Sequence, residues 1–287
     1  MNDGNDLDPR QPAAGPEALE AFVASVQHLP LFSGTAVQLV RSFDRTDITA
    51  QELAGLIATD AALAVHLLRI VNSPFYGLSR RIGTVADAVA VLGLNLVRRT
   101  VTAAVLQRPL LAALDERVAR TFWRHELVCA ALSRHLAARS GADPEFAYMA
   151  GLLHDVGRLV MLMRFPDRAA LLLQPRDEAD HDRIDQEQAL FGFDHAQVGA
   201  ALLELWGLPE GMVQAAHQHV DEVEPDDPGA ASVWRANLIA HEAADDFDGT
   251  APADDDEPEE APWMAAIGLS SKAYAQMRNE IAALEAG

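Results

Sequence analysis

Apolar residues recur every three or four positions along most of the chain, which is the spacing of one buried face of an α-helix. No convincing run shows the two-residue alternation of a half-buried strand bounded by turn residues. The pattern therefore predicts an all-α protein built from a string of short helices. With 287 residues, 49% of them apolar, the chain is long enough to bury at least one sizeable core.

Side chains that cap the first turn mark where several of these helices begin. Helices are predicted to begin after Thr49, Asp60, Thr84, Asp143-Pro144 and Asp194. The first of these is a capping box with Glu52, and the third helix is expected to stop at Gly93. Pro209 then restarts the chain in a helix that runs through His217 and His219.

Composition divides the chain into five expected segments. They are a disordered tail (1–15), two helical halves (16–115 and 116–244), an acidic linker (245–262) and a C-terminal helix (263–287). The linker is expected to be disordered because its acidic side chains repel one another. The amphipathic stretch 270–284 either docks back on the core or meets a partner, and the sequence leaves both open.

The net charge of -21 argues against nucleic acid as a partner, because phosphate backbones are bound by clustered Lys and Arg. Arg80-Arg81 and Arg98-Arg99 are local exceptions that either mark a solvated face or meet acidic partners. The N-terminus lacks a secretory signal, and no stretch approaches the roughly 18 continuous apolar residues of a membrane span. We therefore expect a cytoplasmic protein that makes no membrane contact.

Candidate chemistry centres on His154-Asp155, which lies inside the apolar run 150–160. Polar side chains among hydrocarbon neighbours are costly unless something engages them, and a metal ion would do so. The same dipeptide at His181-Asp182 lies in a charged stretch, where both groups stay hydrated. The single cysteine, Cys129, lies between apolar residues and is interpreted as a small core side chain rather than a nucleophile.

The ten histidines fall into two sets by their surroundings. One set has no matching partner pattern and is assigned to the surface or to ordinary packing: His28, His66, His135, His181 and His241. The other set lies on or at the start of predicted helices: His125, His154, His195, His217 and His219. Imidazole and carboxylate ligands suit divalent ions such as Fe, Zn or Mn, but a hydrogen-bonded core histidine is the more common outcome for any one of them. Spacing alone leaves both interpretations open.

Several motifs over residues 29–237 carry a resemblance to a known family. They are Leu29-Pro30, Ile57-Ala58-Thr59-Asp60, Val71-Asn72-Ser73-Pro74-Phe75-Tyr76-Gly77, Leu92-Gly93, Trp123-Arg124-His125, Gly151-Leu152-Leu153-His154-Asp155, Asp194-His195-Ala196-Gln197-Val198-Gly199 and Leu205-Trp206-Gly207-Leu208-Pro209. In this order they resemble the HDOD family of bacterial signalling proteins. That family is related to HD-type metal-dependent phosphohydrolases and to the HD-GYP phosphodiesterases. The resemblance implies a multi-helix, HDOD-type bundle with a degenerate HD-like C-terminal half.

The resemblance also assigns residues to the site. The positions that match HD-type metal ligands are His125, His154, Asp155, His195 and His219. Two positions depart, since Val220 stands where a second histidine would follow His219, and Asn237 stands where the superfamily has its closing aspartate. The glycine-tyrosine-proline loop is absent, and Arg158 stands where HD-GYP enzymes place a lysine beside phosphate. A neutral amide and a valine weaken any two-metal centre.

The resemblance therefore implies a non-catalytic regulatory module that contacts other signalling proteins, with a ligand or one divalent metal ion in its degenerate pocket. The alternative is a weak metal-dependent phosphohydrolase acting on a nucleotide or cyclic dinucleotide, with His154 and Asp155 at its centre. In a third interpretation the polar cluster is a hydrogen-bonded core network without an ion. The signal, the partners and a possible homodimer stay open at this stage.

Overall fold

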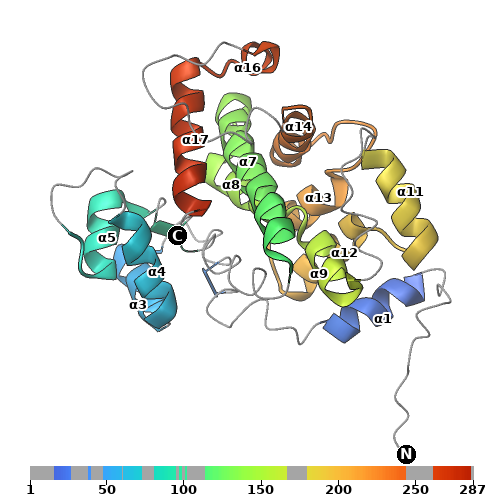
Figure 1. Ribbon diagram of the computed structural model, residues 1–287, viewed down its shortest axis with the longest axis horizontal. Helices are drawn as coiled ribbons and strands as arrows, with labels where there is room; N and C mark the ends of the chain where they lie inside the picture. The colour runs from blue at the N-terminus through green and yellow to red at the C-terminus, as the bar shows by residue number, and fades with distance from the viewer. Residues whose placement is uncertain are drawn as a thin grey trace, which may run out of the picture.

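The fold is given by a computed structural model, which describes residues 16–26, 38–39, 48–59, 61–72, 81–94, 97–98, 101, 114–166, 180–243 and 261–285. Every regular element within these ranges is a helix, which confirms the all-α prediction (Figure 1). The tail 1–15 lies outside the described residues, as do most of the linker 245–262, the motif residues after Asn72, Arg80 and Arg99.

Three helices in the first half share a small core: α3 (Ala50–Ala58), α4 (Ala61–Val71) and α5 (Val85–Leu92). Thr49 caps α3 in the expected box with Glu52, and Thr84 caps α5, which ends at Gly93. Leu53, Leu67 and other apolar side chains of these helices form their own buried cluster. Asn72 holds the end of α4 to the segment before α5, since its amide donates to Leu68 O and Ile82 O and accepts from Ile82 N.

The second half forms a larger bundle around one long central helix. Its helices are α7 (Glu116–Ser140), α8 (Pro144–Leu153), α9 (Val156–Arg164), α11 (Asp180–Phe191), α12 (His195–Leu205), α13 (Glu210–Gln218) and α14 (Pro228–Glu242). Helix α7 packs on α8 and α14, while α12 packs on α9 and α13. The predicted caps at Asp143-Pro144 and Asp194 are both present. This arrangement brings side chains of α7, α11 and α12, and of the ends of α8, α9 and α13, into one interior.

Helix α1 (Pro16–Val26) belongs to the larger core, although the sequence placed it in the first half. Its Phe22 ring lies 5.4 Å from the Phe165 ring and 5.0 Å from the Phe193 ring, measured between centroids. Helix α1 therefore packs with the helices after residue 115 rather than with α3, α4 and α5.

The C-terminal segment docks back on the core, which settles one question that the sequence left open. Helix α16 (Pro262–Ala266) is followed by α17 (Ser271–Glu285), which runs beside α7 (Figure 1). The buried side chains of α17 recur at helical spacing and include Tyr274, Met277, Ile281 and Leu284. Two ion pairs flank this face, Arg124–Glu285 at 2.6 Å and Arg134–Glu280 at 2.7 Å.

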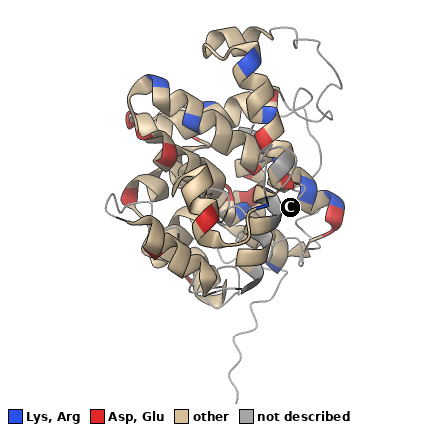
Figure 2. Cartoon of the chain, turned by 90° about the vertical axis from the view of Figure 1, so that its left-hand side faces the viewer, with Lys and Arg blue, Asp and Glu red and all other residues tan. Residues whose placement is uncertain are grey.

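Among the residues that the structure describes, one helical stretch, Pro144–Arg164, is long and apolar enough to cross a membrane by length and composition. Its most apolar window is 83% buried inside the protein, so its hydropathy is accounted for by the core. Figure 2 shows acidic and basic residues interspersed along the described helices.

Candidate metal centre

His154 and Asp155 form the junction between α8 and α9. His154 ends α8 in a helical conformation, and Asp155 precedes α9 with φ -103° and ψ 16°. Asp155 makes no side-chain cap to α9. Its carboxylate is thus available to the interior of the bundle, where both side chains are almost completely buried.

A close crossing of two glycines places this junction against α12. A Cβ atom added at Gly157 would lie 2.1 Å from the carbonyl oxygen of His195 and 2.4 Å from the nitrogen of Gly199. Only glycine permits such an approach of α9 to the backbone of α12. Because Gly157 lies two residues after Asp155, the crossing brings Asp155 next to His195.

Three buried histidines have their Nδ1 atoms engaged by protein acceptors. His154 Nδ1 donates to Gly151 O at 2.7 Å, His195 Nδ1 to Glu187 Oε2 at 2.7 Å, and His219 Nδ1 to Ala216 O at 2.9 Å. These bonds fix the tautomer of the neutral ring and leave the Nε2 lone pair available. This is the arrangement that orients histidines as metal ligands.

The Nε2 atoms and one carboxylate oxygen converge. His195 Nε2 lies 3.2 Å from His219 Nε2, and Asp155 Oδ1 lies 3.3 Å from the former and 3.8 Å from the latter. Ligand atoms that share one ion at about 2.0–2.1 Å stand roughly 3.0–3.4 Å apart. Asp155, His195 and His219 thus form one candidate ligand group.

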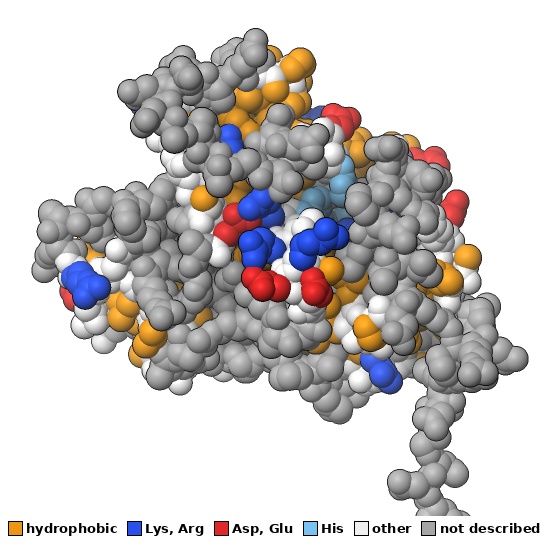
Figure 3. Space-filling model, viewed as in Figure 1, with side chains coloured by type: hydrophobic (Ala, Val, Ile, Leu, Met, Phe, Trp, Pro, Cys, Tyr) orange, Lys and Arg blue, Asp and Glu red, His pale blue; other side chains and the backbone are white. Residues whose placement is uncertain are grey.

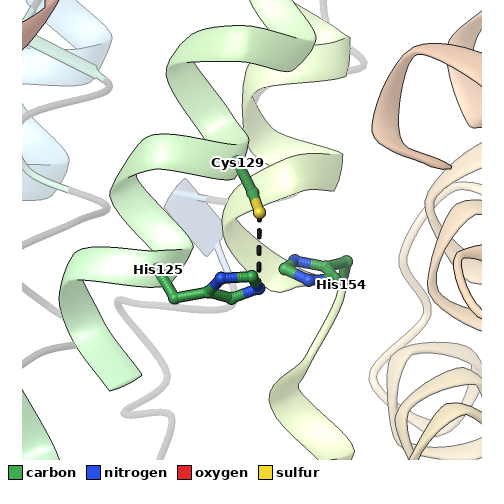
Figure 4. A group of neighbouring side chains, drawn as sticks. All are labelled: His125, Cys129 and His154. Atoms are coloured by element: carbon green, nitrogen blue, oxygen red, sulfur yellow. Dashed lines mark hydrogen bonds between the residues drawn. The ribbon is translucent and has the colours of Figure 1, made fainter. Parts of the chain in front are cut away.

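A second candidate group extends from the same aspartate toward α7. It contains His125, Glu126, His154 and Asp155, and a third group joins Cys129 to His125 and His154. Figure 4 shows Cys129 one turn along α7 from His125, with its sulfur 3.4 Å from His125 Nε2. Asp155 is therefore shared between the α12–α13 side and the α7 side of one continuous cluster.

Acidic side chains are buried together with the histidines of the cluster. Three buried carboxyl groups, those of Glu126, Asp155 and Glu187, contact its histidines. Arg158 supplies one guanidinium, 3.1 Å from Asp155 Oδ2. Buried charge needs compensation, and a divalent cation provides it. His154 Nε2 and Asp155 Oδ1 are buried without a hydrogen-bond partner, which an ion between them would satisfy. The donor set therefore fits a divalent metal ion.

The surroundings shift the pKa values of the cluster in opposite directions. Burial, His241 and His154 hold the pKa of His125 well below its ordinary value, and burial, His154 and His195 do the same for His219. Burial would lower the pKa of His154, but Glu126 and Asp155 outweigh it and raise that pKa to about 9. Without an ion, a proton on His154 thus provides positive charge.

The carboxyl groups respond to the same charges. Burial raises the pKa of Glu126 to about 7. Burial acts in the same direction on Asp155, yet His195, Arg158 and His154 hold its pKa well below the usual range. Asp155 therefore stays ionised at neutral pH.

The structure brings together all five residues that matched metal positions: His125, His154, Asp155, His195 and His219. Arg158 contacts the cluster through Asp155. Asn237 is buried and its amide donates to the backbone oxygen of His219 at 3.5 Å. Val220 is half-buried, and His217 is exposed on α13.

The other histidines behave less uniformly than the sequence suggested. His135 bonds to Ile267 O, which joins α7 to the end of α16. His241 is exposed, as expected, but its ring lies 4.7 Å from that of His125, so it borders the cluster. His28 and the side chains of His66 and His181 lie outside the described residues.

Two carboxylates of the cluster were not found from the sequence. Glu126 follows His125 on α7, and Glu187 accepts from both the backbone nitrogen and Nδ1 of His195. Glu187 lies in the polar helix α11, where an acidic residue is ordinarily exposed. Only its position next to His125 could have drawn attention to Glu126.

Histidine side chains reach the surface on one face of the molecule. Figure 3 shows them in the middle of that face, close to a group of basic and acidic side chains. His125 is half-buried and His241 exposed, whereas His154, His195 and His219 are at most 3% exposed. The part of the cluster on α7 is therefore its more accessible end.

Comparison with known proteins agrees with this architecture. The HDOD domain pattern matches residues 29–222. An uncharacterized protein of Treponema pallidum (strain Nichols) is 26% identical over 204 residues, which are 70% of this chain. The chain spans only 39% of that relative's length.

Solved structures show the same fold. An HDOD domain protein with unknown function from Geobacter sulfurreducens has a TM-score of 0.69 at 26% identity, covering 94% of this chain and 95% of the other. A "Putative phosphohydrolase" from Shewanella amazonensis SB2B has a TM-score of 0.68 at 23% identity, covering 93% and 98%. The second likeness concerns the fold alone. Since the HDOD pattern spans well over half of the chain, the protein belongs to the HDOD-domain family.

Proposed function

We propose that this protein is a regulatory module that holds a divalent metal ion in its buried cluster without catalysing phosphoester hydrolysis. The ion would be bound by Asp155 and by the Nε2 atoms of the oriented histidines. When bound, a divalent ion supplies Lewis acidity and positive charge. Here it would serve as a ligand that stabilises one arrangement of the helices and so of the surface offered to signalling partners.

The burial of the cluster is the observation that carries this proposal. His154 is 0% exposed, Asp155 and His195 are 2% and His219 is 3%. A hydrolase must admit both a phosphate group and a water molecule to its metal ions. These four side chains thus leave little surface for a phosphate group and a water molecule, and the cluster is more accessible only at the half-buried His125. A bare ion is small enough to be taken up during a brief opening.

Two substitutions in the site also favour a non-catalytic role. Asn237 brings no negative charge, and its amide is directed to the backbone of His219. Val220 has no donor atom. In addition, Arg158 contacts Asp155 Oδ2 and thereby competes for one oxygen of the carboxylate that both ligand groups share. These features weaken a two-metal centre and leave a single ion as the simpler occupant.

A weak phosphohydrolase is the second candidate, and the convergence of Asp155, His195 and His219 favours it. One protein preparation distinguishes the two functions. Metal content is measured after purification without added metal or chelator, and hydrolysis of bis(p-nitrophenyl) phosphate and of cyclic di-GMP is followed with Mn²⁺ or Fe²⁺ present. We expect bound metal and no turnover above a protein-free blank.

Variants make the test decisive. Hydrolysis by the wild type that is abolished in His154→Ala would overturn the regulatory proposal. Strong hydrolysis appearing in the double variant Asn237→Asp/Val220→His would show that only those two changes had silenced the site. A protein that holds no metal under any loading condition would leave the hydrogen-bonded network as the role of the cluster.

A further inference from the structure

We propose that the α7 end of the cluster holds a thiophilic metal ion such as Zn²⁺, with Cys129 as a thiolate ligand together with His125 and His154. This inference rests on the proposed metal binding and adds a ligand outside the set that the sequence resemblance assigned. It also gives the single cysteine a chemical role in place of a purely packing one.

The geometry places the three donors around a common point. Cys129 lies four residues after His125, so both side chains project from the same face of α7. The sulfur is 3.4 Å from His125 Nε2, and a nitrogen of His154 completes a group whose atoms all lie within 4.8 Å of one another. Figure 4 shows the sulfur above the two imidazole rings. Sulfur and nitrogen ligands of one tetrahedral zinc ion stand roughly 3.5 Å apart, given Zn–S of about 2.3 Å and Zn–N of about 2.0–2.1 Å.

Unsatisfied atoms at the same place point independently to a ligand. His154 Nε2 is buried without a hydrogen-bond partner, while its Nδ1 is engaged by Gly151 O. Glu126 Oε1 is also buried without a partner, and Glu126 belongs with His125 and His154 to a second ligand group. Two buried ligand atoms without a hydrogen-bond partner, next to a cysteine, are not accounted for by apolar packing.

A thiolate changes which metal the site prefers. Sulfur ligands select Zn²⁺ and other soft ions, whereas carboxylate and water ligands suit Mn²⁺ and Mg²⁺. The α12–α13 side offers nitrogen and oxygen donors from Asp155, His195 and His219. Only the α7 side offers sulfur among the described residues, and Cys129 is the one cysteine of the chain. Loss of that atom should therefore change zinc affinity far more than manganese affinity.

Cobalt substitution of the whole 287-residue chain tests the inference directly. Co²⁺ bound by a thiolate gives an intense sulfur-to-metal charge-transfer band in the near ultraviolet, which nitrogen and oxygen ligands do not give. We expect this band in the wild type, its loss in Cys129→Ser, and its retention in Ser133→Ala. Ser133 lies one turn further along α7 and is fully buried, so it controls for disturbance of the helix interior.

Competition with a chromogenic chelator provides the second measurement. We expect Cys129→Ser to weaken Zn²⁺ binding at least 10-fold and to leave Mn²⁺ binding within about 2-fold of the wild type. If Cys129→Ser does not fold, the wild-type spectrum alone still decides. Cobalt bound in full stoichiometry without the band would overturn the thiolate ligand and leave the proposed function standing. Complete absence of metal binding overturns the inference, whereas turnover of a phosphodiester overturns only the proposed function.

Discussion

At the scale of single residues, the cluster is organised by the atoms that hold the histidines rather than by the histidines alone. An imidazole presents a lone pair in a fixed direction only when its other nitrogen has a fixed partner. Two of the three Nδ1 partners are backbone oxygens, Gly151 O and Ala216 O, which substitution cannot remove. The third partner is the side chain of Glu187, so His195 is the one of these three histidines whose orientation can be changed by substituting its Nδ1 partner.

Glu187→Gln should weaken metal binding about 10- to 100-fold, the usual cost of changing a partner that orients a metal-bound histidine. The amide can still accept one bond from His195, but it loses the negative charge that polarises the ring. Chelator competition measures the affinity. The exposed Glu204→Gln on α12 is the matched control and should behave like the wild type. An unchanged affinity in Glu187→Gln would mean that His195 is not a ligand.

At the scale of helices, the site depends on one crossing. Asp155 immediately precedes α9 and His195 begins α12, and these residues meet because Gly157 lets the two backbones approach. Ion pairs and caps each contribute on the order of 1 kcal/mol and hold individual helices in place. A crossing of two backbones is different, because a single added methyl group must push the helices apart.

Gly157→Ala should therefore lower the free energy of unfolding by about 3 kcal/mol or more and abolish metal binding. Gly55→Ala is the opposite case, since Gly55 lies inside α3 and a Cβ there meets nothing within 4 Å. Alanine at that position should stabilise the protein by about 0.5–1 kcal/mol through helix propensity. Denaturant unfolding measures both changes, and equal small effects would refute the role assigned to the crossing.

Local signals were sufficient for the helices and insufficient for the full site. The capping residues Thr49, Thr84 and Asp194 act within a few positions, so their helices were correctly placed from sequence. Glu187 could not be found in this way, because only the packing of α11 against α12 buries it against His195. Cys129 was correctly expected to be buried, yet its contact with His154 depends on how α7 and α8 pack.

At the scale of the whole molecule, the described residues contain two separate buried clusters. Helices α3, α4 and α5 share one, and the larger cluster joins α1 with the described helices after residue 115. The candidate ligands all belong to the larger bundle. Binding of an ion should therefore stabilise that bundle directly. The core of α3, α4 and α5 should be stabilised only if it unfolds together with the larger bundle.

Hydrogen exchange with and without Zn²⁺ tests this division. At 100 times its Kd, a ligand stabilises the bound state by about 2.7 kcal/mol, which is roughly a 100-fold slowing of exchange through openings that break the site. We expect this slowing in the central amides of α7, α8 and α12, with little change in α3 and α5. Equal protection of both groups would show instead that the two cores open as one unit.

The packing of α1 and α14 in the larger core determines where this domain can be cut for fusion to another protein. The family pattern spans residues 29–222, but Phe22 and Val233, which lie outside it, are 2% and 0% exposed in the larger core. A fusion protein cut at the limits of the pattern would open that core to water on two sides and would lack Asn237 beside His219. Such a fusion protein should aggregate through its exposed core instead of folding into a functional module.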